Sequence, residues 1–171
     1  MQQDCFLFKN SIIIQILWLL TLVTIPLLSI FGRPVQRFLK ENLSHNQITI
    51  ILGLVLLVLS FKAIYWLIRR HSYRRVWHLL WFVPLFIIAP YFMPVVEERV
   101  HFIVFGCFGF LSMLIFPPRT AIALCISISV LDEGLQWYLP DRVGDWFDVS
   151  INMLASVAGA IFSFIIWKQK C

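Results

Sequence analysis

Charged residues are scarce in this chain. Only 13% of its 171 residues are charged, 60% are hydrophobic, and the mean hydropathy is +0.86. A soluble domain carries about 25% charged residues, so this composition excludes a soluble domain and indicates an integral membrane protein. The net charge of +5 then indicates basic loops at a membrane. We expect no nucleic-acid partner, because no soluble domain remains to bind one.

Cysteines are few and lack a ligand-like spacing. The chain has four, Cys5, Cys107, Cys125 and Cys171, and none forms a CxxC pair. This spacing predicts neither a disulfide framework nor a metal-binding knuckle. Cys107 and Cys125 fall inside apolar runs, where we expect them to act as small packing residues.

Long apolar runs are abundant instead. A helix needs about 20 apolar residues to cross a bilayer, and six runs approach this length. The runs are Ile12–Ile30, Ile48–Leu67, Val76–Met93, Val100–Phe116, Thr120–Leu139 and Val149–Trp167. They predict an all-α bundle of about six transmembrane helices, the third of which is interrupted by Pro84 and Pro90. After the first run, "RPVQRFLKENL" predicts a short helix on the membrane surface, with Pro34 at its first helical position.

Basic residues predict the orientation of the helices, because Lys and Arg are enriched in cytoplasmic loops. With the N-terminus inside, eight basic residues lie in inner segments and five in outer segments. The inner ones are Lys9, Arg69, Arg70, Arg74, Arg75, Arg119, Lys168 and Lys170, and the outer ones are Arg33, Arg37, Lys40, Arg99 and Arg142. We therefore predict a multi-pass protein of the cell membrane with both termini cytoplasmic, and "RRHSYRR" as a contact for anionic lipid head groups.

Acidic residues concentrate in one part of the chain. Of the nine, only Asp4 and Glu41 lie outside the segment from Glu97 to Asp148. The predicted topology brings this segment to the extracytoplasmic ends of the last three runs. A carboxylate at mid-depth in a membrane costs roughly 2.5–3.5 kcal/mol on insertion scales, so the paired Asp132 and Glu133 indicate a site where polar residues meet.

Chemical roles follow from the residue types. Glu133 or Asp132 is a candidate general base, and His101 a candidate acid or electrostatic stabiliser. The candidate substrate-binding residues are Gln136, Arg142, Asp145, Asp148, Asn152 and Glu98. Arg142 is suited to hold a phosphate or carboxylate. Carboxylates are also hard donors for a divalent cation, but no dedicated metal spacing is present, so we assign neither a metal site nor a cofactor.

A structural explanation of the same residues stands beside the functional one. The polar side chains could form a clasp that ties three helices together without chemistry, and Asp145 could cap the last helix. On that helix, small residues follow Asn152 at Ala155, Ser156 and Gly159. Small residues allow close helix packing in lipid, so we expect this helix to pack on the fifth run.

Two segments resemble the VanZ-like family of membrane proteins. They are "EERVHF", from Glu97, and "DEGLQWYLPDRVGDWFDVSINMLASVAG", from Asp132. The resemblance covers roughly residues 76–167 and suggests two regions, an N-terminal two-span region at 1–75 and a VanZ-like four-helix core at 76–171. The chain departs from the family at Asp141 and Ala155, where Gly is usual, and at Val104 and Phe105, where many members have Glu-Tyr.

The resemblance implies a role at the cell envelope. The named member of the family is associated with resistance to the glycopeptide antibiotic teicoplanin. We therefore expect an outward-facing site that binds or processes an envelope lipid or glycan intermediate, with membrane lipids, a lipid-linked glycan or a glycopeptide as partners. The alternative is a non-catalytic accessory subunit bound to other membrane proteins, and whether the protein is an enzyme stays open.

Overall fold

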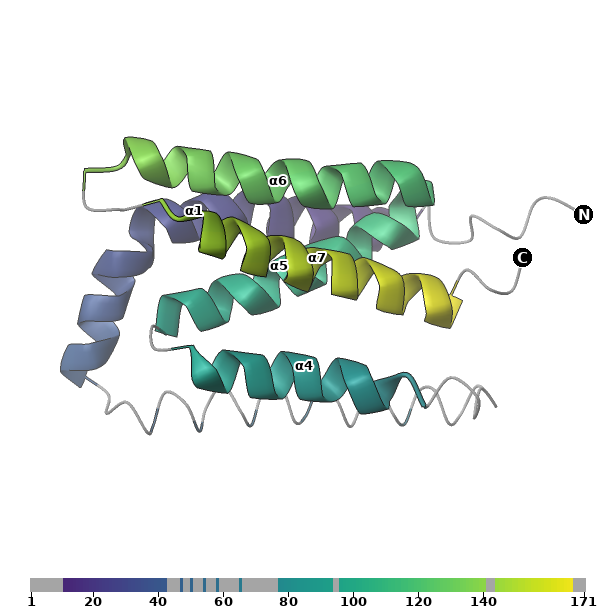
Figure 1. The fold of residues 1–171 in the computed structure, drawn as a ribbon, viewed down its shortest axis with the longest axis horizontal. Helices are drawn as coiled ribbons and strands as arrows, with labels where there is room; N and C mark the ends of the chain where they lie inside the picture. Colours follow the sequence, from purple (N-terminus) through teal and green to yellow (C-terminus); the bar gives the residue numbers. More distant parts are fainter. Residues whose placement is uncertain are drawn as a thin grey trace, which may run out of the picture. The chain divides into compact units, whose positions relative to one another are not determined.

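The computed structural model describes residues 11–42, 77–93, 96–140 and 144–167, together with Gln47, Ile50, Leu54, Val58 and Tyr65. Five helices occupy the four ranges (Figure 1). They are α1 (Ile12–Asn42), α4 (Leu79–Phe92), α5 (Val96–Ile115), α6 (Pro118–Tyr138) and α7 (Trp146–Trp167). These ranges contain no strand, and the predicted all-α class is confirmed.

Three of the described helices are long and apolar enough to cross a membrane. These segments are Ile12–Pro34, Glu98–Ile115 and Trp146–Ile166, which correspond to the first, fourth and sixth predicted runs. The protein is therefore a multi-pass membrane protein, while six spans are not shown. Most of the second predicted run, Ile48–Leu67, lies outside the described residues, as does the basic segment "RRHSYRR".

The third and fifth predicted runs also form helices, α4 and α6, but neither is both long enough and apolar enough to count among these three candidate spans. Helix α4 has 14 residues and contains Pro84 and Pro90, so at 1.5 Å per residue it is about 21 Å long, shorter than the roughly 30 Å hydrocarbon core. Helix α6 has 21 residues and the necessary length. However, it carries Asp132 and Glu133 among its buried residues, and these carboxylates lower its apolarity.

The predicted surface helix after the first run is not a separate element. Helix α1 continues without interruption to Asn42, so Pro34 lies inside a helix rather than at the start of one. Proline lacks an N–H group and removes one helical hydrogen bond, a loss that membrane helices tolerate. The expectation failed because proline and glycine in a sequence favour a helix boundary without enforcing one.

The chain divides into two compact units. One unit comprises Met1–Gly32 and Val100–Cys171, and the other comprises Arg33–Arg99. In the second unit, Arg99 is buried, and its Nε and Nη2 atoms donate to the Met93 carbonyl oxygen at 2.9 and 2.8 Å. This arginine, assigned to an outer segment from the sequence, thus links the first turns of α5 to Met93, the residue that follows α4.

Within the first unit, α5 and α7 touch at their backbones. A Cβ atom on Gly109 would lie 1.8 Å from the Ser156 carbonyl oxygen, and one on Gly159 would lie 2.1 Å from that of Gly106. The small residues of α7 were expected to pack on the fifth run, which is α6. Helix α6 does contact α7, and the Ser156 side chain bonds to Cys125 of α6, so this expectation is confirmed. The backbone at Ser156 and Gly159 also meets α5, because α5 presents glycines there.

Other contacts complete the bundle of the first unit. On α1, Trp18 Nε1 donates to Ser112 Oγ of α5 at 2.9 Å, and the indole stacks on Phe108 with 5.9 Å between ring centroids. On α6, Cys125 is buried in a small core that includes Ala160 of α7, as expected for a packing residue. Cys107 is exposed, so the same expectation was wrong for it.

Candidate polar site

The centre of the site is a buried turn of α6. Asp132, Glu133 and Gln136 are 4%, 0% and 7% exposed. Gln136 Nε2 donates to Asp132 Oδ2 and to Glu133 Oε2, at 3.2 Å in both cases. The spacing explains this contact, since residues three and four apart lie on one side of a helix. One amide thus links both carboxylates.

Two further helices contribute to the same carboxylate of Asp132. Ser29 Oγ on α1 donates to Asp132 Oδ1 at 2.5 Å and lies 3.2 Å from His101 Nε2 on α5. His101 Nε2 is 3.7 Å from Asp132 Oδ2. A hydroxyl has one proton and accepts with its lone pairs. Because the short contact to Asp132 uses that proton, we assign the proton between Ser29 and His101 to the imidazole Nε2.

Ser29 is the functional candidate that sequence reasoning missed. It is 0% exposed, and it sits in an apolar run with two other hydroxyl residues, Thr21 and Thr24. Those two donate to carbonyl oxygens of their own helix, at Trp18 and Leu20. Ser29 also lies 3.4 Å from the Ile25 carbonyl, the usual partner of a serine inside a helix. No periodicity in the sequence distinguishes it from its neighbours.

Glu133 connects α6 to the start of α7. The backbone N–H of Asp145 donates to Glu133 Oε1 at 2.8 Å. The side chain of Asp145 accepts from the N–H of Phe147 at 3.0 Å and so caps α7, which satisfies one free amide of the helix N-terminus. The capping role considered from sequence is therefore what the structure shows for this exposed side chain.

Two tryptophans and a glycine pack together where α6 ends and α7 begins. Trp137 and Trp146 make an edge contact, with 5.3 Å between ring centroids. A Cβ atom on Gly144 would lie 1.6 Å from Trp137 Cδ1, so only glycine lets the backbone pass directly over this ring. The glycine immediately precedes the amide that binds Glu133, and its small size contributes to the position of that amide.

The remaining predicted residues divide into three groups. Asp148, half-buried on α7, is close enough to interact electrostatically with both His101 and Glu133. Asn152 is buried one turn further along α7. Glu98 lies at the start of α5 and belongs to the other compact unit. Arg142 falls outside the described residues.

We call Ser29, His101, Asp132, Glu133 and Gln136 the polar cluster. They come from α1, α5 and α6, and the cluster joins four side chains singled out by sequence with one that was not. Within the described ranges, no group of three or more His, Cys, Asp or Glu side chains has a metal-binding arrangement.

Comparison with known protein families gives a match to VanZ/LLP1 over residues 13–167. The chain belongs to the VanZ/LLP1 family. The match to VanZ/LLP1 begins in α1 and therefore includes Ser29, whereas the resemblance seen in the sequence was limited to residues 76–167. No curated protein and no solved structure matches the chain.

Proposed function

We propose that the polar cluster binds an envelope lipid or a lipid-linked glycan and transfers a proton during its processing. The observation that supports this most is the burial of Asp132, Glu133 and His101, each less than 6% exposed, in one hydrogen-bonded group of a membrane protein. Ionisable side chains within membranes are costly and are usually retained for function. The basic residues favour an extracytoplasmic position for this site.

The contacts suggest a division of roles. Asp132 receives hydrogen bonds from Ser29 and Gln136, and Ser29 Oγ also lies 3.2 Å from His101 Nε2, so the Ser29 hydroxyl can relay a proton from the imidazole to the carboxylate. Glu133 is a second candidate base, held by the Asp145 amide. Arg142, three residues before Asp145, is proposed to hold a phosphate or carboxylate of the substrate. A change in envelope lipids would connect this activity to teicoplanin resistance.

One observation favours a second function, a non-catalytic accessory subunit with the polar cluster as a structural clasp. Both oxygens of Glu133 accept from groups of the protein itself, and so do both oxygens of Asp132. Buried carboxylates that are satisfied internally specify how helices pack. Under this proposal the substitutions described next would remove the protein from the membrane instead of inactivating it.

The test uses Glu133→Gln, Asp132→Asn and His101→Gln, which keep shape and much of the hydrogen bonding. The measurements are the amount of protein in the membrane, teicoplanin susceptibility and lipid turnover. Ser129→Ala is the matched control, since Ser129 is also buried on α6 but donates only to the Cys125 carbonyl. Normal protein level with loss of phenotype supports the proposed site. Loss of the protein in all three variants, but not in the control, supports the clasp.

A further inference from the structure

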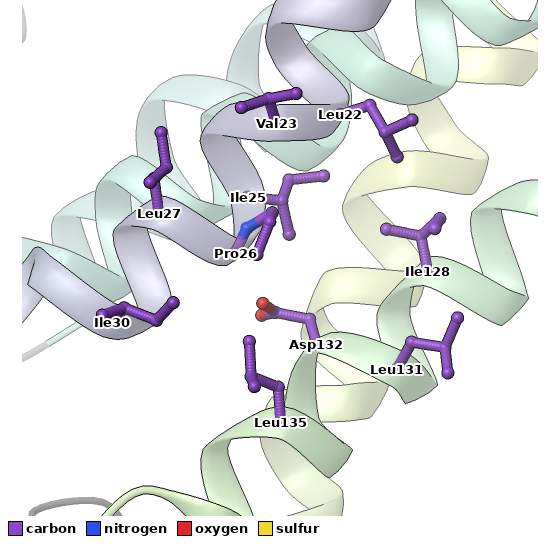
Figure 2. A pocket seen from close by; sticks show the side chains of 10 residues that line it. All are labelled: Leu22, Val23, Ile25, Pro26, Leu27, Ile30, Ile128, Leu131, Asp132 and Leu135. Atoms are coloured by element: carbon purple, nitrogen blue, oxygen red, sulfur yellow. The ribbon is translucent and has the colours of Figure 1, made fainter.

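The middle of α6 presents aliphatic side chains to its surroundings. Val130 and Leu131 are exposed there. Figure 2 shows the same character on the side of α6 that faces α1, where Ile128 and Leu135 line an apolar groove. Aliphatic side chains make no hydrogen bonds and are suited to the hydrocarbon core of a bilayer.

Aromatic side chains replace the aliphatic ones where α6 ends and α7 begins. Trp137, Tyr138 and Trp146 are 50%, 89% and 66% exposed, and the two indole rings make the edge contact described above. We call these three residues the aromatic rim. Tryptophan and tyrosine are enriched where a membrane meets water, because each combines an apolar ring with a polar group. The change from aliphatic to aromatic side chains therefore marks the edge of the hydrocarbon layer.

The polar atoms of the aromatic rim favour head groups over hydrocarbon. Among the residues that the structure describes, the indole N–H groups of Trp137 and Trp146 have no hydrogen-bond acceptor. A donor without a partner is costly in hydrocarbon, whereas phosphates, ester carbonyl groups and water in the head-group layer accept its proton. In bulk water, by contrast, the large apolar surface of both rings would stay hydrated, which is unfavourable.

The lengths of the two helices agree with this position. The span Trp146–Ile166 of α7 has 21 residues, or about 31 Å at 1.5 Å per residue, close to the roughly 30 Å hydrocarbon core. Its first residue belongs to the aromatic rim. At the opposite end of α6, Arg119 is exposed, about 27 Å from Trp137 along the helix. An arginine near a helix end reaches the head groups with its long side chain.

We propose that the aromatic rim binds the lipid head-group layer on one side of the membrane and Arg119 binds it on the other, so that α6 crosses the bilayer. The rim then sets the depth of the polar cluster. Asp132 and Glu133 lie about 6–8 Å below Trp137 along the helix, near the edge of the hydrocarbon and far from its centre. This inference does not depend on the proposed function, because the depth is the same whether the polar cluster processes a lipid or only joins helices.

The experiment measures the depth of tryptophan side chains in the full chain, in nanodiscs of phosphatidylcholine and phosphatidylglycerol. Fluorine-labelled tryptophan gives a separate NMR signal for each position, and Trp137→Phe and Trp146→Phe assign the two signals of the aromatic rim. Lipids carry a nitroxide either on the head group or at the end of an acyl chain, and the nitroxide broadens the signals of nearby fluorine atoms. We expect the head-group nitroxide to broaden both rim signals more than the chain-end nitroxide does.

Two tryptophans introduced on α6 are the matched comparisons. Val130→Trp lies on the same face as Trp137 and about 10 Å deeper along the helix, so it should respond more to the chain-end nitroxide. Thr120→Trp, next to Arg119, should again respond more to the head-group nitroxide. Both positions are exposed, so neither substitution disturbs the core.

The pattern along α6 decides the outcome. A shallow, a deep and again a shallow position at 120, 130 and 137 supports the inference. Shallow positions throughout would mean that α6 lies on the membrane surface, and a deep position at 120 would mean that it ends within the bilayer. Either result overturns the crossing. Rim signals that respond more to the chain-end nitroxide, or to neither nitroxide because another protein chain covers the rim, overturn its contact with head groups.

Discussion

Ser29 and Asp132 form the shortest side-chain contact described in the polar cluster, 2.5 Å between Oγ and Oδ1. The two residues belong to α1 and α6 and are 103 positions apart in the chain. Through this contact, the first helix becomes part of the site that the later helices build.

The first prediction concerns this hydroxyl. Ser29→Ala leaves one buried carboxylate oxygen without its donor and should lower the free energy of unfolding by about 1–3 kcal/mol. Thr24→Val is the control, because Thr24 donates only to the Leu20 carbonyl of its own helix, and its effect should be smaller. Thermal unfolding of the purified protein in detergent measures both. Equal effects would show that the contact with Asp132 contributes nothing particular.

The second prediction concerns the backbone contact of α5 with α7. Gly109→Ala places a methyl group where the Ser156 carbonyl lies, so the helices must separate and lose close packing. Overpacking of this kind typically costs about 1–3 kcal/mol, and more where backbone cannot move.

Gly134→Ala is the matched control for that substitution. A Cβ atom there meets nothing within 4 Å, and alanine is preferred to glycine inside a helix by about 1 kcal/mol. We therefore expect opposite signs for the two substitutions in the same unfolding assay. A destabilisation of similar size in both would contradict the packing described for α5 and α7.

The third prediction concerns the loop that reaches Glu133. Gly144→Ala would force the loop away from Trp137 and weaken the bond from the Asp145 amide to Glu133. Trp137→Ala removes the obstructing ring, so the double variant should lose less stability than the sum of the single variants. A double-mutant cycle should give a coupling of about 0.5–3 kcal/mol. Strict additivity would contradict the steric explanation.

The fourth prediction separates the two roles of Glu133. Glu133→Gln retains an oxygen that can accept from the Asp145 amide, whereas Glu133→Ala leaves that amide and the Gln136 side chain without their partner. Glu133→Ala should therefore cost about 1–3 kcal/mol of stability, and Glu133→Gln clearly less. Comparable losses in the two variants would indicate that charge, and not hydrogen bonding, holds this end of α6.

The sequence predicted the helical class and the residues of α6 well, for a physical reason. Asp132, Glu133 and Gln136 are conspicuous in an apolar segment, and their spacing on one helix determines their contacts with one another. His101 was also placed with them, because a helix that returns across the membrane brings its polar end back to the same side.

Other features could not be predicted because they depend on partners distant in the sequence. Ser29 looks like an ordinary intrahelical serine until α6 lies beside it. The contact of Gly106 with Gly159 depends on how α5 and α7 are rotated, which small-residue spacing alone does not determine. Pro34 favoured a helix start, but proline restricts its own backbone angle to values that a continuing helix also uses.

The contact of Ser29 with Asp132 has a consequence for biogenesis. Because α1 precedes α6 in the chain, α1 is synthesised first. Until α6 is present, the Ser29 hydroxyl needs another hydrogen-bond acceptor. The Ile25 carbonyl, 3.4 Å from Ser29 Oγ, can serve until α6 emerges from the ribosome. When Asp132 is synthesised, its donor Ser29 is already part of the chain. The order of the helices along the chain therefore lowers the free-energy cost of inserting the carboxylate.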